Sequence, residues 1–229
     1  METNWRTAYR SFYYEQMPDN LPELVLDPSL TALLVIDLQN CYLPEVPGAD
    51  LVEWERWAPF RERLSEIVVP NTAVLLDTFR ALEREVIFAR IACVTPDGRD
   101  RSLSHARPGF NNLLLPEHSS EAQILPQVAP LPAEIVICKT TDSALTGTSL
   151  RLLLSNLGIR NVVVCGIFTD QCVASTVRSL ADESFNVIVV DDACAAATQE
   201  LHCAELTIIN NIYCQVLTTQ ETLSSLSTK

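Results

Sequence analysis

Residues 162–178 read VVVCGIFTDQCVASTVR. An apolar run of strand length passes through a tight turn at Gly166 and continues into a helical pattern. This order places the thiol of Cys172 just beyond the carboxyl end of a buried strand, at the beginning of a helix. Unpaired N–H groups and the positive end of the helix dipole favour a thiolate at such a position. The stretch therefore predicts a strand–turn–helix unit that carries a candidate nucleophile.

The rest of the chain repeats this alternation of apolar runs and helical patterns, which is typical of βαβ units. The runs are almost continuously apolar, as expected for a sheet that is covered on both faces. We therefore predict one doubly wound α/β domain. The expected strands are residues 31–38, 85–91, 134–138, 161–165, 186–190 and 212–218, and the expected helices are 53–82, 149–157, 172–183 and 199–211.

Two segments fall outside this alternation. We predict that residues 1–28 form an N-terminal arm, because aromatic residues such as Trp5 and Tyr9 favour packing on the domain surface or on a neighbouring subunit. Residues 29–229 then form the single domain. Residues 94–132 are rich in Pro, Gly, Ser and Asn, and they are too long for a routine connection. A segment of this kind is typical of a lid or a binding loop.

Composition narrows the classes of partner. A net charge of −13 argues against nucleic acid or an anionic membrane surface as a partner. No apolar stretch reaches membrane-spanning length, and the first twenty residues lack the apolar core of a signal peptide. The eight cysteines contain no CxxC pair. We therefore expect a cytoplasmic protein with free thiols and a small-molecule substrate.

Three chemically active residues stand at the ends of expected strands. Asp37 ends the first strand, Lys139 ends the third, and Cys172 follows the fourth. Ligands of open parallel sheets bind at the carboxyl ends of the strands, so these side chains should converge. A cysteine nucleophile needs a base, and a neighbouring ammonium stabilises both the thiolate and the carboxylate. Each residue alone is more often structural: a cap, a solvated strand end or a small core residue.

Four blocks of sequence resemble the isochorismatase-like cysteine hydrolases. They are LLVIDLQ at 33–39, KTTDSALTGTSL at 139–150, GIFTDQCV at 166–173 and VDDACA at 190–195. Their order and spacing are those of the family, and the resemblance spans residues 31–219. It implies a three-layer α/β/α sandwich with a mostly parallel sheet, assembled as a homodimer or homotetramer.

The resemblance also implies the roles of particular residues. Asp37, Lys139 and Cys172 become a catalytic triad. A cis peptide bond is expected between Ile167 and Phe168, so that the N–H groups of Phe168 and Cys172 point at an oxyanion. Nicotinamidases of the family carry a metal-binding Asp-x-His after the second strand, but residues 90–97 here read RIACVTPD. We therefore expect no metal and no other cofactor.

The expected reaction is hydrolysis of a C–N bond in a small amide, ureido or N-carbamoyl compound through a thioester. An alternative is hydrolysis of a vinyl ether of the isochorismate kind, with Asp37 as the acid and Cys172 incidental. A binding or scaffold protein is a third possibility, and the joint presence of Lys139 and Cys172 argues against it. A redox thiol protein is a fourth, and the absence of CxxC argues against it.

Three further residues are candidates for substrate binding. Gln39 and Tyr42 follow the Asp37 strand and are placed to line the pocket, although Gln39 is equally suited to capping the next segment. Arg90 ends the second strand and is suited to bidentate binding of a substrate carboxylate. Its alternative role is an ion pair with a structural acid. Asp191 and Asp192 are expected in a turn that caps the following segment.

Overall fold

The computed structural model describes residues 8–18, 24–44, 50–109 and 112–226. Within these residues one sheet has the strand order β3-β2-β1-β4-β5-β6, and all of its strand pairs are parallel. The strands are β1 (Thr31–Ile36), β2 (Val86–Ile91), β3 (Ile135–Lys139), β4 (Asn161–Ile167), β5 (Asn186–Ala195) and β6 (Gln215–Leu217). Every residue of β1, β2 and β4 is buried, as the apolar runs predict.

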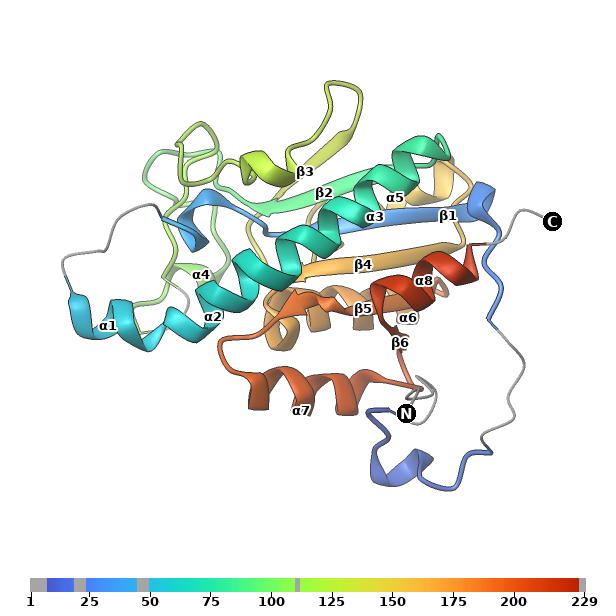
Figure 1. The fold of residues 1–229 in the computed structure, drawn as a ribbon. Coiled ribbons are helices and arrows are strands. Elements are labelled where there is room, and N and C mark those ends of the chain that lie inside the picture. Colours follow the sequence, from blue (N-terminus) through green and yellow to red (C-terminus); the bar gives the residue numbers. More distant parts are fainter. Residues whose placement is uncertain (1–7, 19–23, 45–49, 110–111, 227–229) are drawn as a thin grey trace.

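Helices cover both faces of this sheet. In Figure 1, α3 and α8 lie on the near face, while α5 and α6 lie on the far face. The helices are α1 (Leu51–Arg56), α2 (Ala58–Arg63), α3 (Val69–Ala81), α4 (Leu103–Ala106), α5 (Leu150–Asn156), α6 (Ala174–Asp182), α7 (Gln199–Ile209) and α8 (Thr219–Ser225). The predicted three-layer α/β/α sandwich is confirmed. None of the helices in the described part of the chain has the length and apolar character needed to cross a membrane.

The long helix expected at residues 53–82 is divided. It consists of α1, α2, a π-helical stretch at Leu64–Val68, and α3. Both α2 and α3 have a proline in their first turn, at Pro59 and Pro70. Pro59 follows the turn at Trp57, where its missing N–H needs no partner, whereas Pro70 follows the π-helical stretch without a break in the helix.

The prediction of a turn at Asp191 and Asp192 was wrong. Strand β5 continues to Ala195, so both residues lie within it. Asp192 nevertheless binds the first residue of a helix. The Asp192 carboxylate accepts hydrogen bonds from the backbone N–H and the hydroxyl of Thr219, at 2.7 and 2.8 Å, and Thr219 is the first residue of α8.

Strands β1 and β4 approach unusually closely at their carboxyl ends. Ile36 is paired with Gly166, whose φ is +119°, a value that L side chains rarely adopt. A Cβ built on Gly166 would lie 2.0 Å from the carbonyl oxygen of Ile36. Only glycine therefore permits this approach, and it brings the residue after Ile36 beside the segment that follows β4.

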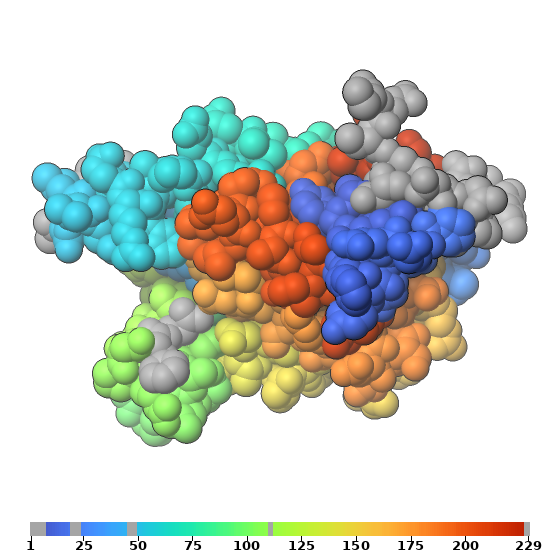
Figure 2. Space-filling model, turned by 90° about the horizontal axis from the view of Figure 1, so that it is seen from below, coloured from blue at the N-terminus to red at the C-terminus, as the bar shows by residue number. Residues whose placement is uncertain are grey.

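Leu26 and Pro28 are buried, whereas the rest of the described part of the predicted arm, residues 8–18 and 24–28, lies on the domain surface. Figure 2 shows it in blue beside the orange surface of α7. The Tyr9 hydroxyl donates to Asp191 Oδ2 at 2.8 Å, and Asn210 Nδ2 donates to the carbonyls of Ala8 and Tyr9 at 3.0 and 3.2 Å. Trp5 lies outside the described residues. The division into an arm and one domain at residue 28 stays a prediction.

Candidate active site

Asp37 stands at the end of β1 in a strained backbone conformation. Its φ is +53°, which is uncommon for any residue except glycine and less so for aspartate. The neighbouring strand β2 holds it in place, because the Asp37 N–H donates to the Ala89 carbonyl at 2.8 Å. The Ile91 N–H donates to Asp37 Oδ1 at 2.9 Å. The carboxylate is thus aimed by two backbone contacts.

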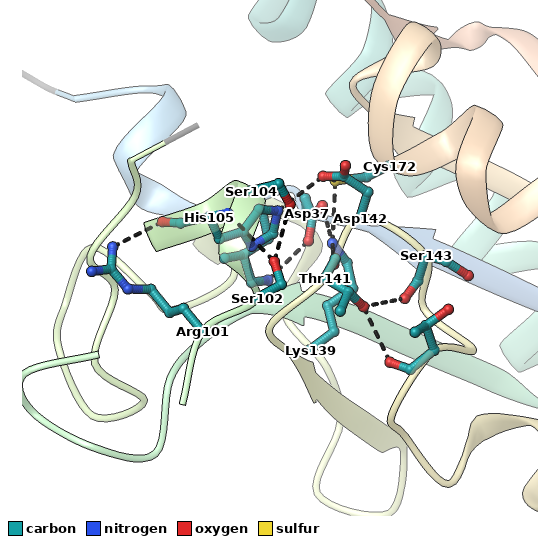
Figure 3. Close-up of polar contacts among 12 residues, drawn as sticks. Asp37, Arg101, Ser102, Ser104, His105, Lys139, Thr141, Asp142, Ser143 and Cys172 are labelled. Carbon is teal, nitrogen blue, oxygen red and sulfur yellow. Dashed lines mark hydrogen bonds and ion pairs between the residues drawn. The ribbon is translucent and has the colours of Figure 1, made fainter. Parts of the chain in front are cut away.

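Lys139 joins the carboxylate to the thiol. It ends β3, and its side chain is fully buried. The ammonium lies 2.8 Å from Asp37 Oδ2, and it donates to Cys172 Sγ at 3.2 Å and to the carbonyl of Thr141 at 3.2 Å. An ammonium has three N–H groups, so these three acceptors satisfy it. The structure therefore brings together Asp37, Lys139 and Cys172 (Figure 3).

Cys172 lies in a π-helical segment, Thr169–Val173, that leads into α6. Its side chain is 2% exposed. Burial raises the pKa of the Cys172 thiol well above its ordinary value, and the Asp37 carboxylate adds to this effect, while Lys139 opposes it. Burial thus opposes the preference for a thiolate that is expected at a helix N-terminus.

Burial and the ion pair between Asp37 and Lys139 together shift the pKa values of both residues. Burial raises the pKa of Asp37 by more than the Lys139 ammonium lowers it. Burial alone would lower the pKa of Lys139, but Asp37 and Cys172 raise it by more. An aspartate with a raised pKa is a better proton acceptor near neutral pH than an ordinary one. The thiol therefore sits beside a carboxylate suited to accept its proton.

A second carboxylate touches the thiol, and the sequence analysis did not single it out. Asp142 follows β3, and its Oδ1 accepts from Cys172 Sγ at 3.6 Å and from His105 Nε2 at 2.9 Å. His105 lies on the short helix α4 and is completely buried. The hydrogen bond from His105 lowers the pKa of Asp142, and the Lys139 ammonium contributes. Asp142 could have been suspected from its place three residues after Lys139, whereas no pattern points to His105.

The peptide bond between Ile167 and Phe168 is cis. Phe168 precedes the π-helical segment, and its carbonyl accepts from the N–H groups of Gln171 and Val173 at 3.0 and 3.1 Å. These bonds fix the backbone that leads to Cys172. The oxyanion role of the Phe168 and Cys172 N–H groups stays a prediction.

A cavity of about 590 Å³ opens over Cys172. The ring of Phe168 stands among the aromatic side chains of its wall, with centroids 4.9 Å from Phe60, 5.3 Å from Tyr42 and 5.9 Å from Trp57. Such separations are typical of favourable aromatic pairs. The complete lining is Cys41, Tyr42, Pro44, Asp50, Glu53, Trp54, Trp57, Phe60, Arg61, Ile91, Leu113, Phe168, Gln171 and Cys172.

Of the three candidate substrate-binding residues, the structure places only Tyr42 at this cavity. The Gln39 side chain is fully buried, donates to the carbonyls of Ile91 and Ala122, and accepts from the Ile91 N–H. Arg90 donates to the carbonyls of Glu117 and Ala122 and lies 3.9 Å from the Glu117 carboxylate. Both side chains therefore serve to hold the loop that contains Glu117 and Ala122.

Among the described residues, no group of three or more His, Cys, Asp or Glu side chains is placed so that it could hold a metal ion. Independence from metal stays a prediction.

A model of the isochorismatase domain matches residues 31–221. The chain belongs to the isochorismatase family. Among family relatives, the protein YddQ of Bacillus subtilis is 30% identical over 200 residues, which cover 83% of this chain and 97% of YddQ. The ureidoacrylate amidohydrolase RutB of Pantoea ananatis is 30% identical over 205 residues, 83% of this chain and 79% of RutB.

Solved isochorismatase family structures share the fold. A member from Burkholderia thailandensis is 29% identical and superposes with a TM-score of 0.73, covering 90% of this chain and 100% of that one. The resemblance drawn from the four sequence blocks is thus confirmed.

Proposed function

We propose that this isochorismatase family protein is a cysteine amidohydrolase that cleaves a C–N bond of a small amide, ureido or N-carbamoyl compound through a thioester, without a metal. One observation carries the proposal: the buried Lys139 ammonium lies 2.8 Å from the Asp37 carboxylate and 3.2 Å from the Cys172 sulfur. A vinyl ether hydrolase needs an acid but has no use for a thiol held this way. The amidohydrolase activity named for the relative RutB supports the same choice.

The first half of the proposed cycle forms the thioester. Asp37 takes the proton of the Cys172 thiol as the sulfur attacks the carbonyl carbon, and the carbonyl oxygen becomes an oxyanion. The N–H groups of Phe168 and Cys172 stabilise that oxyanion. Asp37 then gives its proton to the leaving nitrogen, the C–N bond breaks, and the amine departs.

The second half of the cycle hydrolyses the thioester. Asp37 takes a proton from a water molecule, whose oxygen attacks the thioester carbon. The C–S bond breaks, the sulfur regains a proton from Asp37, and the acid is released. Lys139 stays charged throughout and stabilises whichever partner, carboxylate or thiolate, is negative at each step.

The cavity supports a substrate of modest size with a flat or apolar body. Its volume of about 590 Å³ lies in the range of small-molecule pockets. Tyr42, Trp57, Phe60 and Phe168 form one connected aromatic wall beside the thiol. Such a wall favours a planar or aliphatic group next to the reacting carbonyl.

The test is a screen of ammonia release over a panel of primary amides, ureides and N-carbamoyl acids. Cys172→Ala serves as the blank, and circular dichroism verifies its fold. We expect turnover on part of the panel and none by the variant. Equal rates for the two proteins would overturn the mechanism, and retained hydrolysis of a vinyl ether by Cys172→Ala would establish the alternative reaction.

We also propose a homodimer or homotetramer in the cytoplasm, with a small-molecule substrate and without nucleic acid or membrane partners. The net charge of −13 and the family resemblance support this assignment. Light scattering coupled to gel filtration measures the assembly, and a monomeric mass would contradict it.

A further inference from the structure

The proposed cycle uses the Asp37 carboxylate, and the second carboxylate at the thiol, that of Asp142, has no role in it. Asp142 Oδ1 lies 3.6 Å from Cys172 Sγ, on a loop that is separate from the Asp37 strand. Its side chain is 35% exposed, whereas that of Asp37 is 1% exposed. Asp142 is therefore reached by solvent beside the sulfur, although it is not among the residues that line the cavity.

His105 fixes this carboxylate. Its Nε2 lies 2.9 Å from Asp142 Oδ1, and its side chain has no exposed surface. The backbone of His105 is held in turn, because its N–H donates to Ser102 Oγ at 3.3 Å and its carbonyl accepts from Arg101 at 3.0 Å (Figure 3). With so many contacts, His105 presents one N–H to Asp142 in a set direction.

The surroundings of the two carboxylates suit them to different tasks. Burial raises the pKa of Asp37, whereas the hydrogen bond from His105 lowers the pKa of Asp142. A carboxylate that binds a proton weakly is a poor base but a dependable hydrogen-bond acceptor, since it stays ionised. His105, Lys139 and Cys172 interact with Asp142, and 35% of its side chain stays exposed.

We propose that Asp142 accepts a hydrogen bond from an N–H group of the substrate beside the scissile carbonyl, with His105 as its positioning residue. The substituents of a carbonyl carbon that bonds to Cys172 sulfur lie two bonds from that sulfur, within reach of Asp142. The site therefore takes substrates with an unsubstituted amide, ureido or cationic nitrogen at this place. It rejects a carboxylate there by charge repulsion. This preference for one kind of substrate rests on the proposed amidohydrolase function.

The test compares two alkylating agents of similar size, iodoacetamide and iodoacetate. The first carries an amide N–H, and the second carries a carboxylate at the same place. Alkylation of Cys172 is followed by mass spectrometry of the peptide, so that the other cysteines do not interfere. The ratio of the two rates is divided by the ratio measured for free cysteine under the same conditions.

In the native protein we expect this normalised ratio to favour iodoacetamide by about tenfold, the scale of one unit charge acting over a few ångströms in a partly wet site. Asp142→Asn should bring the ratio near that of free cysteine. Glu117→Gln is the control, because it removes a carboxylate that lies beside Arg90 instead of Cys172. This variant should keep the ratio within about twofold of the native value. An unchanged ratio in a folded Asp142→Asn protein would overturn the proposal.

His105 is tested by a matched pair of variants. His105→Gln keeps an N–H donor for Asp142 and should retain the selectivity, whereas His105→Leu removes the donor and should lose most of it. Equal losses in both variants would overturn the positioning role. Because alkylation needs no turnover, a changed ratio without any amide hydrolysis would refute the proposed function and leave the role of Asp142 in place.

Discussion

The Asp37 carboxylate and the Lys139 ammonium face each other at 2.8 Å, and at most 1% of either side chain is exposed. Replacing Lys139 by methionine would leave a buried carboxylate without its partner. We expect the free energy of unfolding to fall by about 3–5 kcal/mol, as when other buried pairs lose one member. Urea denaturation at neutral pH measures the loss.

Two further variants show whether the charge, rather than the shape, causes that loss. Asp37→Asn combined with Lys139→Met removes both charges and should be more stable than Lys139→Met alone. Arg151→Met breaks an exposed ion pair with Glu183 and should cost little. A double variant less stable than Lys139→Met would contradict the explanation.

Buried thiols make the stability of the protein sensitive to alkali. Burial raises the pKa of Cys165 from 9.0 to about 12, and it raises the pKa values of Cys194 and Cys214 as well. Between pH 9.0 and 12 the unfolded chain releases the Cys165 proton while the folded chain keeps it. Stability therefore falls as the pH rises through this window, by about 1.4 kcal/mol per pH unit for each such thiol.

Urea denaturation under reducing conditions, at several pH values between about 8 and 10, measures this slope. Cys165→Ala removes one titrating thiol, so its slope should be shallower than the native slope by about 1.4 kcal/mol per pH unit near the upper end. The cavity that the substitution leaves lowers stability equally at every pH and does not affect the comparison. Identical slopes would show that Cys165 does not carry this dependence.

Gly166→Ala should prevent correct folding. The added Cβ would meet the backbone of Ile36 at 2.0 Å, and the φ of +119° would be strained. Gly158→Ala is the matched control, because Gly158 also has a positive φ, +71°, but nothing lies within 4 Å of its Cβ position. We expect Gly158→Ala to remain folded with a modest loss of melting temperature. Soluble, active Gly166→Ala protein would show that β1 and β4 can separate there.

The hydroxyl of Thr169 should matter for both stability and rate. It lies 2.8 Å from His202 Nδ1, and both side chains are fully buried. Thr169→Val keeps the shape but leaves the imidazole nitrogen unpaired, which should cost about 1–3 kcal/mol. Because Thr169 begins the segment that holds Cys172, we also expect a lower kcat with little change in KM.

Thr169→Ser restores a hydroxyl and serves as the control for this prediction. It should recover most of the stability and of kcat. If the serine variant is as slow as the valine variant, the methyl group rather than the hydrogen bond is what positions the segment.

The sequence was informative where a rule of topology applies. Asp37, Lys139 and Cys172 were predicted to meet because parallel strands end at one edge of a sheet, and the structure places them in contact. The contact between His105 and Asp142 follows no such rule. It joins the short helix α4 to the loop after β3, 37 residues further along the chain, and only the packing of the long loop brings them together.

Other predictions failed because sequence patterns do not report burial. A helix N-terminus suggested a thiolate at Cys172, whereas burial raises the pKa of that thiol. Gln39 was a candidate for the pocket because it follows Asp37. Its side-chain amide is instead hydrogen-bonded to backbone groups of Ile91 and Ala122. Which polar side chain faces a cavity depends on neighbours that are distant in sequence.

Part of the cavity lining comes from a different part of the molecule than the reacting groups do. Trp54 and Phe60 belong to α1 and α2, which lie beyond the end of the sheet, whereas Asp37 and Cys172 are set by the backbones of β1 and β4 (Figure 1). Changes in the two short helices can thus alter what binds without moving the atoms that react. A laboratory library of variants confined to α1 and α2 would therefore test new substrates while the reacting groups stay the same.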